Sequence, residues 1–471
     1  MEADIGLIGL AVMGQNLVLN LNDHGYTVAV YNRTVSKVDE FMEGTAKGSD
    51  VIGAHSLQEF FLKLKRPRKV MLMVKAGAPV DALIDDCLPF LESGDILIDG
   101  GNSLYSDTER RVKALEEKGI FFLGMGVSGG EEGARHGPSM MPGGNIQAWP
   151  FVKEMFQKIA AKADDGASCA DWVGDGGSGH YVKMIHNGIE YGDMQLIAEA
   201  YQLLKDVGGC TTDELSTIFS TWNQGKLSSY LIEITANIFK KKDINGAPLL
   251  ESILDVAGQK GTGKWTGINA LELGIPVTLI AESVFARYLS SLKEERKEAS
   301  LLYSKAKKEI SVNKIVFTEQ VMQALYASKI VSYAQGFMLM QAAAHEMKWT
   351  LHYETIALLW RGGCIIRSQF LGQIQNAFAK KKDLASLLLD SFFQGEILEC
   401  IQGWRDAVSL AIQAGVAAPA LSSALAFFDG YTTAKLPSNL IQAQRDFFGA
   451  HTYERIDKPR GEFFHTEWSS S

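Results

Sequence analysis

The sequence predicts an α/β domain in the first third of the chain, then a large all-α domain with an internal duplication, and a C-terminal tail. Three observations support this prediction. Strand patterns alternate with helical ones up to residue 177, helical patterns dominate beyond it, and the residues after 434 are loosely patterned. The expected boundaries are therefore 1–177, 178–434 and 435–471, and a chain of 471 residues is long enough for two or three domains.

Short apolar runs that resemble strands alternate with amphipathic stretches in the first domain. Helical patterns such as GQNLVLNLNDHG and DTERRVKALEEKG lie between the runs. This alternation predicts a parallel sheet with helices on both faces. The expected strands are residues 5–10, 27–31, 69–74, 96–99 and 120–125.

Two stretches of the helical part resemble each other at a spacing of roughly 140 residues. VKMIHNGIEYGDMQ is similar in pattern to ALYASKIVSYAQGF, which pairs Tyr191 with Tyr333, and further along Trp222 pairs with Trp360. The second copy lacks the Lys, His, Asn and Glu of the first. We interpret the pair as a duplicated helical unit, with chance similarity between amphipathic helices as the alternative.

The overall charge and the cysteines limit the classes of function. A net charge of −9 argues against nucleic acid or an anionic membrane as the main partner, although a local basic pocket can still bind a small anion. The five cysteines are scattered, and no C-x-x-C occurs, so free thiols in a reducing compartment are expected. The chain opens directly into a strand pattern, and no apolar run is long enough to span a bilayer. We therefore expect a soluble, cytoplasmic protein.

The first expected strand runs into a glycine motif, Gly9-Leu10-Ala11-Val12-Met13-Gly14. This G-x-A-x-x-G pattern is one step from the dinucleotide-binding fingerprint. Gly9 permits the tight turn, Ala11 still lets a pyrophosphate approach, and Gly14 lets the helix lie against the strand. The motif predicts a Rossmann-type cofactor site, and a purely structural strand-to-helix turn is the alternative.

The end of the second expected strand indicates which dinucleotide binds. An acidic residue there would favour NAD, but the sequence has Asn32, Arg33 and Thr34. Arg33 can pair with a 2′-phosphate, and its two neighbours can add neutral donors, so NADP is predicted. A solvated turn arginine is the alternative.

Three further glycine-rich stretches follow. IDGGNS at 98–103 and the stretch 126–144 carry Asn102 and Ser128 beside glycines that permit close approach of a ligand. GQKGTGK at 258–264 resembles a nucleotide P-loop, but Trp265 stands where Ser or Thr is required, so we reject an NTPase. That loop can still hold the phosphate of a smaller substrate.

The stretch KMIHNGIEYGD places four polar residues, Lys183, His186, Asn187 and Glu190, in an otherwise apolar helix. Their spacing puts them on one face, with Lys183 and Glu190 roughly 10.5 Å apart along the axis, so a small sugar acid can lie between them. Burial is expected to lower the pKa of Lys183 and raise that of Glu190, which suits both for acid–base catalysis. The alternative is a His186–Glu190 pair with Lys183 exposed.

Taken together, these motifs resemble those of the 6-phosphogluconate dehydrogenase family over essentially the whole chain. The matching stretches are GLAVMGQN, YNRT, DGGNS, GVSGGEEGAR, KMIHNGIEYGDMQL, GQKGTGKWT, WRGGCIIR and QRDFFGAHTYER. The broader beta-hydroxyacid dehydrogenases share the N-terminal glycines and a helix lysine, but are not expected to share the duplicated helical domain or the C-terminal Arg and His. They remain the alternative enzyme class, and a non-catalytic NADPH-binding or scaffold protein is the other alternative.

The resemblance implies an activity: metal-independent oxidative decarboxylation of 6-phosphogluconate to ribulose 5-phosphate and CO2, with reduction of NADP, a step of the oxidative pentose phosphate pathway. It implies that Lys183 takes the proton from the substrate 3-hydroxyl and then polarises the 3-keto group. It implies that Glu190 protonates C1 of the enediol left after CO2 departs.

The resemblance also implies the binding residues. The cofactor cleft would be lined by the glycine motif, residues 32–34, Val74, Lys75, Ala76 and Asn102. The hydroxyl and carboxylate end of the substrate would contact Asn102, Ser128, Gly129, Gly130, His186 and Asn187. The phosphate would contact Tyr191, Lys260, Thr262 and Arg287. Arg445 and His451 would arrive from the other subunit of a homodimer with exchanged C-terminal tails.

Overall fold

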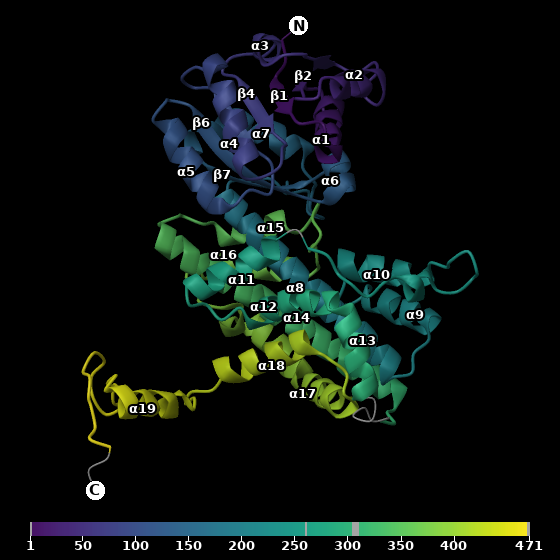
Figure 1. Cartoon of the computed structure of the whole chain (residues 1–471), viewed down its shortest axis with the longest axis vertical. Helices are drawn as coiled ribbons and strands as arrows, with labels where there is room; N and C mark the ends of the chain where they lie inside the picture. The colour runs from purple at the N-terminus through teal and green to yellow at the C-terminus, as the bar shows by residue number, and fades with distance from the viewer. Residues whose placement is uncertain (1, 260, 304–309, 469–471) are drawn as a thin grey trace. The chain divides into compact units, whose positions relative to one another are not determined.

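The computed structural model describes residues 2–259, 261–303 and 310–468 (Figure 1). Its contacts separate two compact units, Met1–Ala424 and Leu425–Ser471, which are described in turn. The finer division at residues 177 and 434 stays a prediction.

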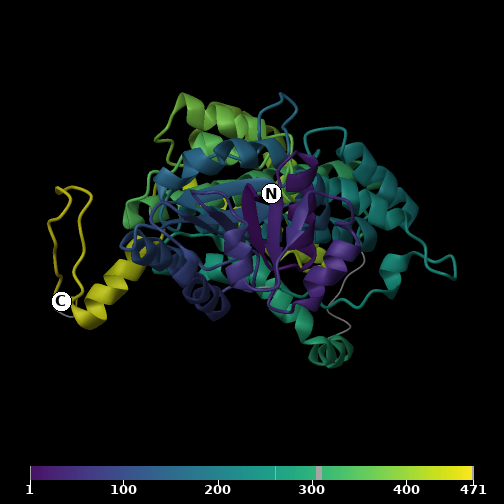
Figure 2. The same cartoon turned by 90° about the horizontal axis from the view of Figure 1, so that it is seen from above.

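The first unit opens with a sheet, which Figure 2 shows from above. Its strands run in the order β3-β2-β1-β4-β5-β6-β7-β8. Neighbouring strands are parallel except β6 and β7, which are antiparallel. The five expected strands are present. Their bounds are β1 Ile5–Ile8, β2 Val28–Tyr31, β4 Lys69–Leu72, β5 Ile96–Asp99 and β6 Phe121–Ser128.

Three strands were not expected from the sequence: β3 Val51–Gly53, β7 Ser139–Gly144 and β8 Gly174–Asp175. β3 and β8 are too short to give a periodic pattern. The β7 sequence, SMMPGG, contains the residues that usually mark a turn, but its pairing with β6 buries it completely. The five expected strands are parallel to one another, as predicted, and the unexpected β7 adds one antiparallel pairing to the sheet.

Helices cover both faces of this sheet, as predicted. One apolar core lies under α1 Val12–Asp23, α2 Ser36–Glu43, α6 Gly130–His136 and α7 Trp149–Ile159. The other lies under α3 Leu57–Leu62, α4 Ala78–Cys87 and α5 Tyr105–Glu116. Ile5 and Leu7 of β1 point into the first core and Ile8 into the second, the alternation expected of a buried strand.

Helices make up the rest of the first unit (Figure 1). No helix among the described residues is long and apolar enough to cross a membrane. The helices are α8 Ser178–Asp206, α9 Thr212–Trp222, α10 Tyr230–Lys240, α11 Thr262–Glu272, α12 Thr278–Ser291, α13 Lys293–Leu302, α14 Lys314–Met347, α15 Tyr353–Leu359, α16 Leu371–Lys380 and α17 Ser391–Ala414. The next helix, α18 Pro419–Tyr431, begins in the first unit and ends in the second.

The proposed duplication stays a prediction, with two observations in its favour. A long helix followed by two shorter ones occurs in both stretches, as α8-α9-α10 and as α14-α15-α16. Ser229 and Ser368, which precede the third helix of each set, pair with each other in an antiparallel bridge. Such a self-pairing of matching positions is typical of two copies related by a two-fold axis.

The second unit holds α19 Ser438–Gly449 and, after it, an isolated antiparallel bridge between Tyr453 and Phe464. Asp446 is fully buried here and organises the segment. Its carboxylate accepts hydrogen bonds from Thr452 N (3.0 Å), Thr466 N (3.1 Å) and Trp468 Nε1 (2.8 Å). The loosely patterned tail is therefore an ordered arm. Local periodicity in the sequence could not show this order, because the Asp446 carboxylate accepts hydrogen bonds from residues up to 22 positions away.

Candidate active site

Glycines bring α8 against the sheet. A Cβ atom at Gly126 of β6 would lie 2.5 Å from Cβ of Lys183, and one at Gly179 of α8 would lie 2.1 Å from the carbonyl oxygen of Gly124. Real Cβ atoms do not approach this closely, so only glycine permits the contact. The Lys183 face of α8 is thus held at the carboxyl end of β6, where ligands bind in open α/β sheets.

Lys183 is buried, with 7% of its surface exposed. Burial lowers its pKa, while Glu190 and Cys364 act in the opposite direction. The alternative with an exposed Lys183 is therefore wrong, and the predicted direction of its pKa shift is confirmed.

His186 is fully buried beside Lys183. Its Nδ1 is 3.4 Å from Lys183 Nζ and 3.9 Å from Glu190 Oε2, and its Nε2 is 3.3 Å from Ser128 Oγ. Burial, reinforced by the Lys183 charge, holds the pKa of His186 well below its usual value. A neutral imidazole therefore links α8 to the end of β6, and a charged His186–Glu190 pair is not formed.

Six of the predicted residues line one cavity of about 500 Å³ beside this helix. Asn187 Nδ2 donates to Thr262 Oγ1 at 3.1 Å, which joins α8 to α11. The Arg287 guanidinium lies 3.5 Å from the centre of the Tyr191 ring, and it donates to the Gly258 carbonyl at 3.1 Å. The lining residues are Asn102, Asn187, Glu190, Tyr191, Met194, Gly258, Gln259, Thr262 and Arg287.

The sequence did not identify Met194, whereas Gly258 and Gln259 belong to the glycine-rich loop at 258–264 that it did identify. Met194 lies one turn beyond Glu190 on the same face of α8, a position that helical periodicity could have identified. Lys260, predicted to bind phosphate, lies outside the described residues. Gly129 and Gly130 begin α6 with positive φ angles of 117° and 62°, next to the Ser128 that contacts His186.

The glycine motif forms the tight turn between β1 and α1. Gly9 has φ 110°, and a Cβ there would lie 2.4 Å from the Met73 carbonyl oxygen. Gly14 is as constrained, since its Cβ would lie 2.0 Å from the oxygen of Gly9. Leu10 N donates to Asn32 Oδ1 at 3.1 Å, and Asn32 Nδ2 donates to the Thr34 carbonyl at 2.9 Å. Asn32 thus braces the turn, while Arg33 and Thr34 are exposed at the end of β2.

A buried arginine that the sequence did not identify joins two loops of the predicted cofactor cleft. Arg111 of α5 is 2% exposed and donates to the Gly77 carbonyl (3.1 Å), to Asp81 (2.8 Å) and to Asp99 (3.4 Å). Asp99 in turn accepts from Gly101 N at 3.0 Å. The loop with Val74, Lys75 and Ala76 is thereby fixed relative to the loop with Asn102.

Arg445 and His451 lie in the C-terminal unit. Arg445 is exposed on α19 and donates to Gln442 Oε1 at 3.0 Å. His451 is exposed as well, and its ring lies 5.8 Å from that of Phe448. Neither side chain is buried in the arm, so both are available to a ligand.

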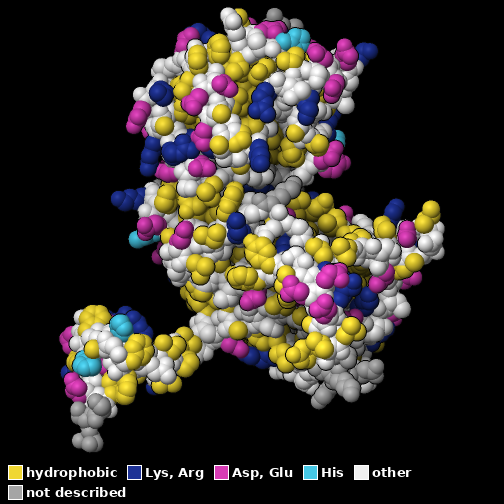
Figure 3. All heavy atoms as spheres, in the orientation of Figure 1, with side chains coloured by type: hydrophobic (Ala, Val, Ile, Leu, Met, Phe, Trp, Pro, Cys, Tyr) yellow, Lys and Arg dark blue, Asp and Glu magenta, His cyan; other side chains and the backbone are white. Residues whose placement is uncertain are grey.

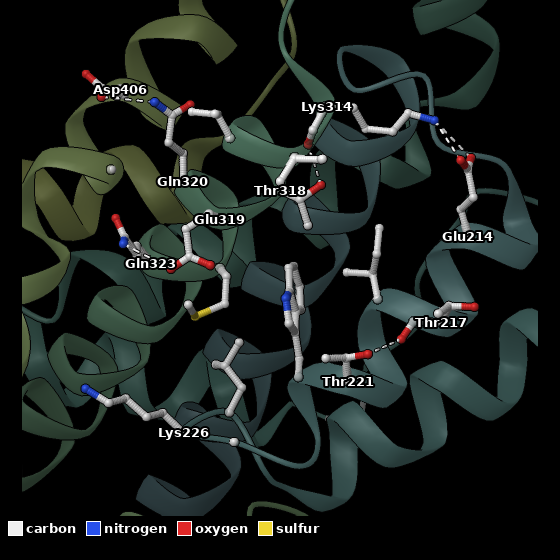
Figure 4. Close-up of a pocket in the computed structure, with 18 of the residues that line it drawn as sticks. Glu214, Thr217, Thr221, Lys226, Lys314, Thr318, Glu319, Gln320, Gln323 and Asp406 are labelled. Atoms are coloured by element: carbon white, nitrogen blue, oxygen red, sulfur yellow. Dashed lines mark hydrogen bonds and ion pairs between the residues drawn. The ribbon is translucent and has the colours of Figure 1, made fainter.

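The described residues hold no group of three or more His, Cys, Asp or Glu placed to bind a metal. A larger cavity, of about 1360 Å³, lies between α9, the start of α14 and α17 (Figure 4). Lys314 in its wall pairs with Glu214 at 2.9 Å, and no predicted site residue lines it. The chemistry expected from the sequence is therefore confined to the smaller cavity.

Two family models match the chain. One describes the NAD binding domain of 6-phosphogluconate dehydrogenase and matches residues 4–174; the other describes the C-terminal domain of the same enzyme and matches residues 179–468. The chain belongs to the 6-phosphogluconate dehydrogenase family. The resemblance inferred from the motifs is thus confirmed, and the beta-hydroxyacid dehydrogenase alternative is set aside.

Relatives in this family match along the full length. The proteins from Haemophilus influenzae and Homo sapiens, both named 6-phosphogluconate dehydrogenase, decarboxylating, are each 60% identical to this chain, over 99% of it and 97% of their own length. The structure of Plasmodium falciparum 6-phosphogluconate dehydrogenase is similar at a TM-score of 0.95 and 46% identity, covering 99% of this chain and 100% of that one. That enzyme was solved in its apo form, with its cofactor NADP+ and with its substrate 6-phosphogluconate.

Proposed function

We propose that this chain catalyses the NADP-dependent oxidative decarboxylation of 6-phospho-D-gluconate to D-ribulose 5-phosphate and CO2. The observation that carries the proposal is the placement of buried Lys183 and of Glu190 on one face of α8. This face adjoins a cavity with Arg287 at its wall, next to a dinucleotide-binding domain. The full-length relatives carry the name of this enzyme.

The N-terminal part suits NADP. Gly9 has a positive φ and no room for a Cβ, so no side chain stands at this position of the turn before α1. A pyrophosphate can therefore approach the N-terminus of the helix. Exposed Arg33 lies where a 2′-phosphate is expected. When bound, NADP accepts the hydride that leaves C3 of the substrate.

Lys183 is the proposed base. Because burial lowers its pKa, a larger share of the amine is neutral near physiological pH and able to take the proton of the 3-hydroxyl. The resulting ammonium then polarises the 3-keto group, so the electrons of the breaking C1–C2 bond move toward that carbonyl and CO2 leaves. Glu190 then protonates C1 of the enediol, which gives the ketose.

The other cavity residues orient the substrate. Arg287, Tyr191, Thr262 and Lys260 are proposed to hold the phosphate, since a guanidinium and neutral donors match its charge. Asn102, Ser128, Gly129, Gly130, His186 and Asn187 are proposed to hold the hydroxyl and carboxylate end. This orientation directs C3 toward Lys183.

Replacement of Arg287 by alanine tests the phosphate end. We expect KM for 6-phosphogluconate to rise about 10- to 100-fold, since a charge-assisted hydrogen bond is lost. KM for NADP should change little. Initial rates over both substrate concentrations measure this, with Arg135→Ala, a surface arginine paired with Asp23, as the control. An unchanged KM for the sugar acid would contradict the assignment of the phosphate pocket.

Replacement of Arg33 by alanine tests the choice of cofactor. We expect KM for NADP to rise about 10- to 100-fold and KM for NAD to stay nearly constant, because only NADP has the 2′-phosphate that the guanidinium pairs with. Lys47→Ala, which removes another exposed cation of the same domain, is the control. Equal loss with both cofactors would show that Arg33 does not select between them.

The activity itself is tested by mixing the protein with 6-phosphogluconate and either NADP or NAD, without added metal. Absorbance of the reduced nicotinamide and release of CO2 are followed together. Equal amounts of NADPH and CO2 support the proposal. Reduction without CO2 would indicate a simple hydroxyacid dehydrogenase, and no reaction from folded protein that binds NADPH would indicate a scaffold.

We further propose a homodimer in the cytoplasm whose C-terminal arms are exchanged. Apolar side chains stand exposed on the arm, among them Phe447 at 63% and Phe448 at 71% (Figure 3). Exposed aromatic side chains in a cluster usually mark an interface. The cytoplasm is supported by the five free, buried cysteines of the described residues.

A further inference from the structure

The mechanism leaves a fully buried ion pair without a role. Lys329 of α14 donates to Asp193 of α8 at 2.6 Å, and both side chains are about 1% exposed. Taking two charges out of water costs free energy that their attraction offsets only when the geometry is held fixed. Asp193 lies one turn beyond Glu190, so the pair fixes α14 against the helix that bears the proposed catalytic residues.

One turn further along α14, Tyr333 lies close to the same carboxylate and also contacts a second segment. Its hydroxyl donates to the Ile366 carbonyl at 2.9 Å and lies 3.5 Å from Asp193 Oδ2. Its ring packs edge-on against Phe370 at 4.8 Å. A single residue of α14 therefore holds the backbone of the turn that follows α15.

This turn, residues 360–366, forms the wall behind the proposed base. The Trp360 ring lies 5.8 Å from His186, at 74° to it. The Gly363 carbonyl accepts from Ser139 N at 2.9 Å and lies 2.6 Å from where a Cβ of Gly129 would be. Cys364 is buried and interacts electrostatically with Lys183. The turn thus packs against His186 and Gly129, and none of its residues lines the cavity.

We propose that α14 braces the active site, with Lys329 and Tyr333 as positioning residues: Lys329 fixes α8, and Tyr333 holds the turn 360–366 shut over Lys183 so that water is excluded. Neither residue is proposed to touch the substrate. The inference rests on the proposed role of Lys183 as the base.

The charged groups around Lys183 show how the exclusion of water affects the pKa of its amine. The titratable groups facing it are His186 and Glu190 of α8 and Cys364 of the turn. Glu190 and Cys364 favour the ammonium, so the lowered pKa of Lys183 comes from burial. If the turn opened and water entered, the pKa would rise toward its ordinary value and less of the amine would be neutral.

The test is Tyr333→Phe, which removes the hydroxyl but keeps the ring against Phe370. We expect the acidic limb of kcat against pH to move upward by about one unit, so that kcat on that limb falls about tenfold. The matched control is Tyr326→Phe, which removes a buried hydroxyl two turns earlier on α14 that faces Glu396 instead of the turn. Its pH profile should match the wild type.

A second measurement follows the turn without using catalysis. Iodoacetamide labelling, quantified by peptide mass, should modify Cys364 faster in Tyr333→Phe than in wild type or Tyr326→Phe, with buried Cys87 of the first domain as the reference. Unchanged labelling of Cys364 together with an unmoved pH limb would overturn the proposal. Faster labelling of Cys364 with an unchanged acidic limb of the pH profile would show that the turn opens but that Lys183 is not the titrating base. This outcome would support the positioning role of Tyr333 and contradict the proposed role of Lys183.

Discussion

Replacing Lys183 by methionine is expected to lower kcat about a thousandfold or more, because general base catalysis is worth about 10²–10⁴ and this residue also polarises the keto group. Methionine fills a similar volume but cannot take a proton. NADPH affinity should stay near the wild-type value, since the Lys183 side chain is not proposed to contact the cofactor. Steady-state rates and a fluorescence titration with NADPH measure the two quantities.

The same substitution has a predictable effect on stability. Burial lowers the pKa of Lys183 below 10.5 in the native state. Between the native pKa and 10.5 the unfolded chain binds a proton that the native chain does not, so native stability rises with pH through that window. Lys183→Met removes this dependence and is expected to be at least as stable as the wild type at neutral pH.

These two effects together distinguish a catalytic lysine from a structural one. Loss of turnover with a retained or raised melting temperature supports the base assignment. Retained turnover would refute it, and a lower melting temperature would show that the buried amine stabilises the fold. Lys329→Met is the contrasting variant: it leaves the Asp193 carboxylate buried and uncompensated, and should cost about 3–5 kcal/mol.

Local periodicity was enough to predict the elements that position the site. The turn at Gly9 and the polar face of α8 are set by residues within a few positions of one another, so the sequence displays them directly. The antiparallel β7 was missed because a strand rich in glycine and proline is stabilised by its partner rather than by its own propensity.

Contacts between distant residues could not be predicted in the same way. In the sequence, Arg111 is one of several charged residues in α5. Only the structure shows that it is buried and that it bonds to both Gly77 and Asp99. The brace through Tyr333 and Ile366 likewise joins elements whose proximity no sequence pattern encodes. Sequence therefore indicated which groups to propose for the chemistry, and the structure was needed to show what holds them in place.

The proposed exchange of arms leads to the second large effect. If Arg445 completes the site of the partner, Arg445→Ala alone should lose at least about tenfold in kcat/KM, since a charge-assisted contact to the substrate is removed. Arg445 is exposed, so the arm itself should stay folded. This loss does not yet show which subunit's site Arg445 serves, because a dimer of identical variants is defective in both arrangements.

A mixed dimer resolves the question. One subunit carries Lys183→Met and the other Arg445→Ala, and two different affinity tags allow the mixed species to be purified. If the arms are exchanged, the intact arm of the first subunit serves the intact Lys183 of the second. One of the two sites is then complete, and the mixed dimer should show about half the wild-type activity.

The matched control pairs Lys183→Met with Glu190→Gln. Both positions lie on α8, so each site of that mixed dimer has one defect whatever the arms do, and activity should stay at background. If the first mixed dimer shows no more than half the activity of the Arg445→Ala dimer, each arm serves its own subunit and the exchange is refuted. Restoration in the first dimer alone requires that Arg445 act across the interface, in which case an isolated monomer cannot form a complete site.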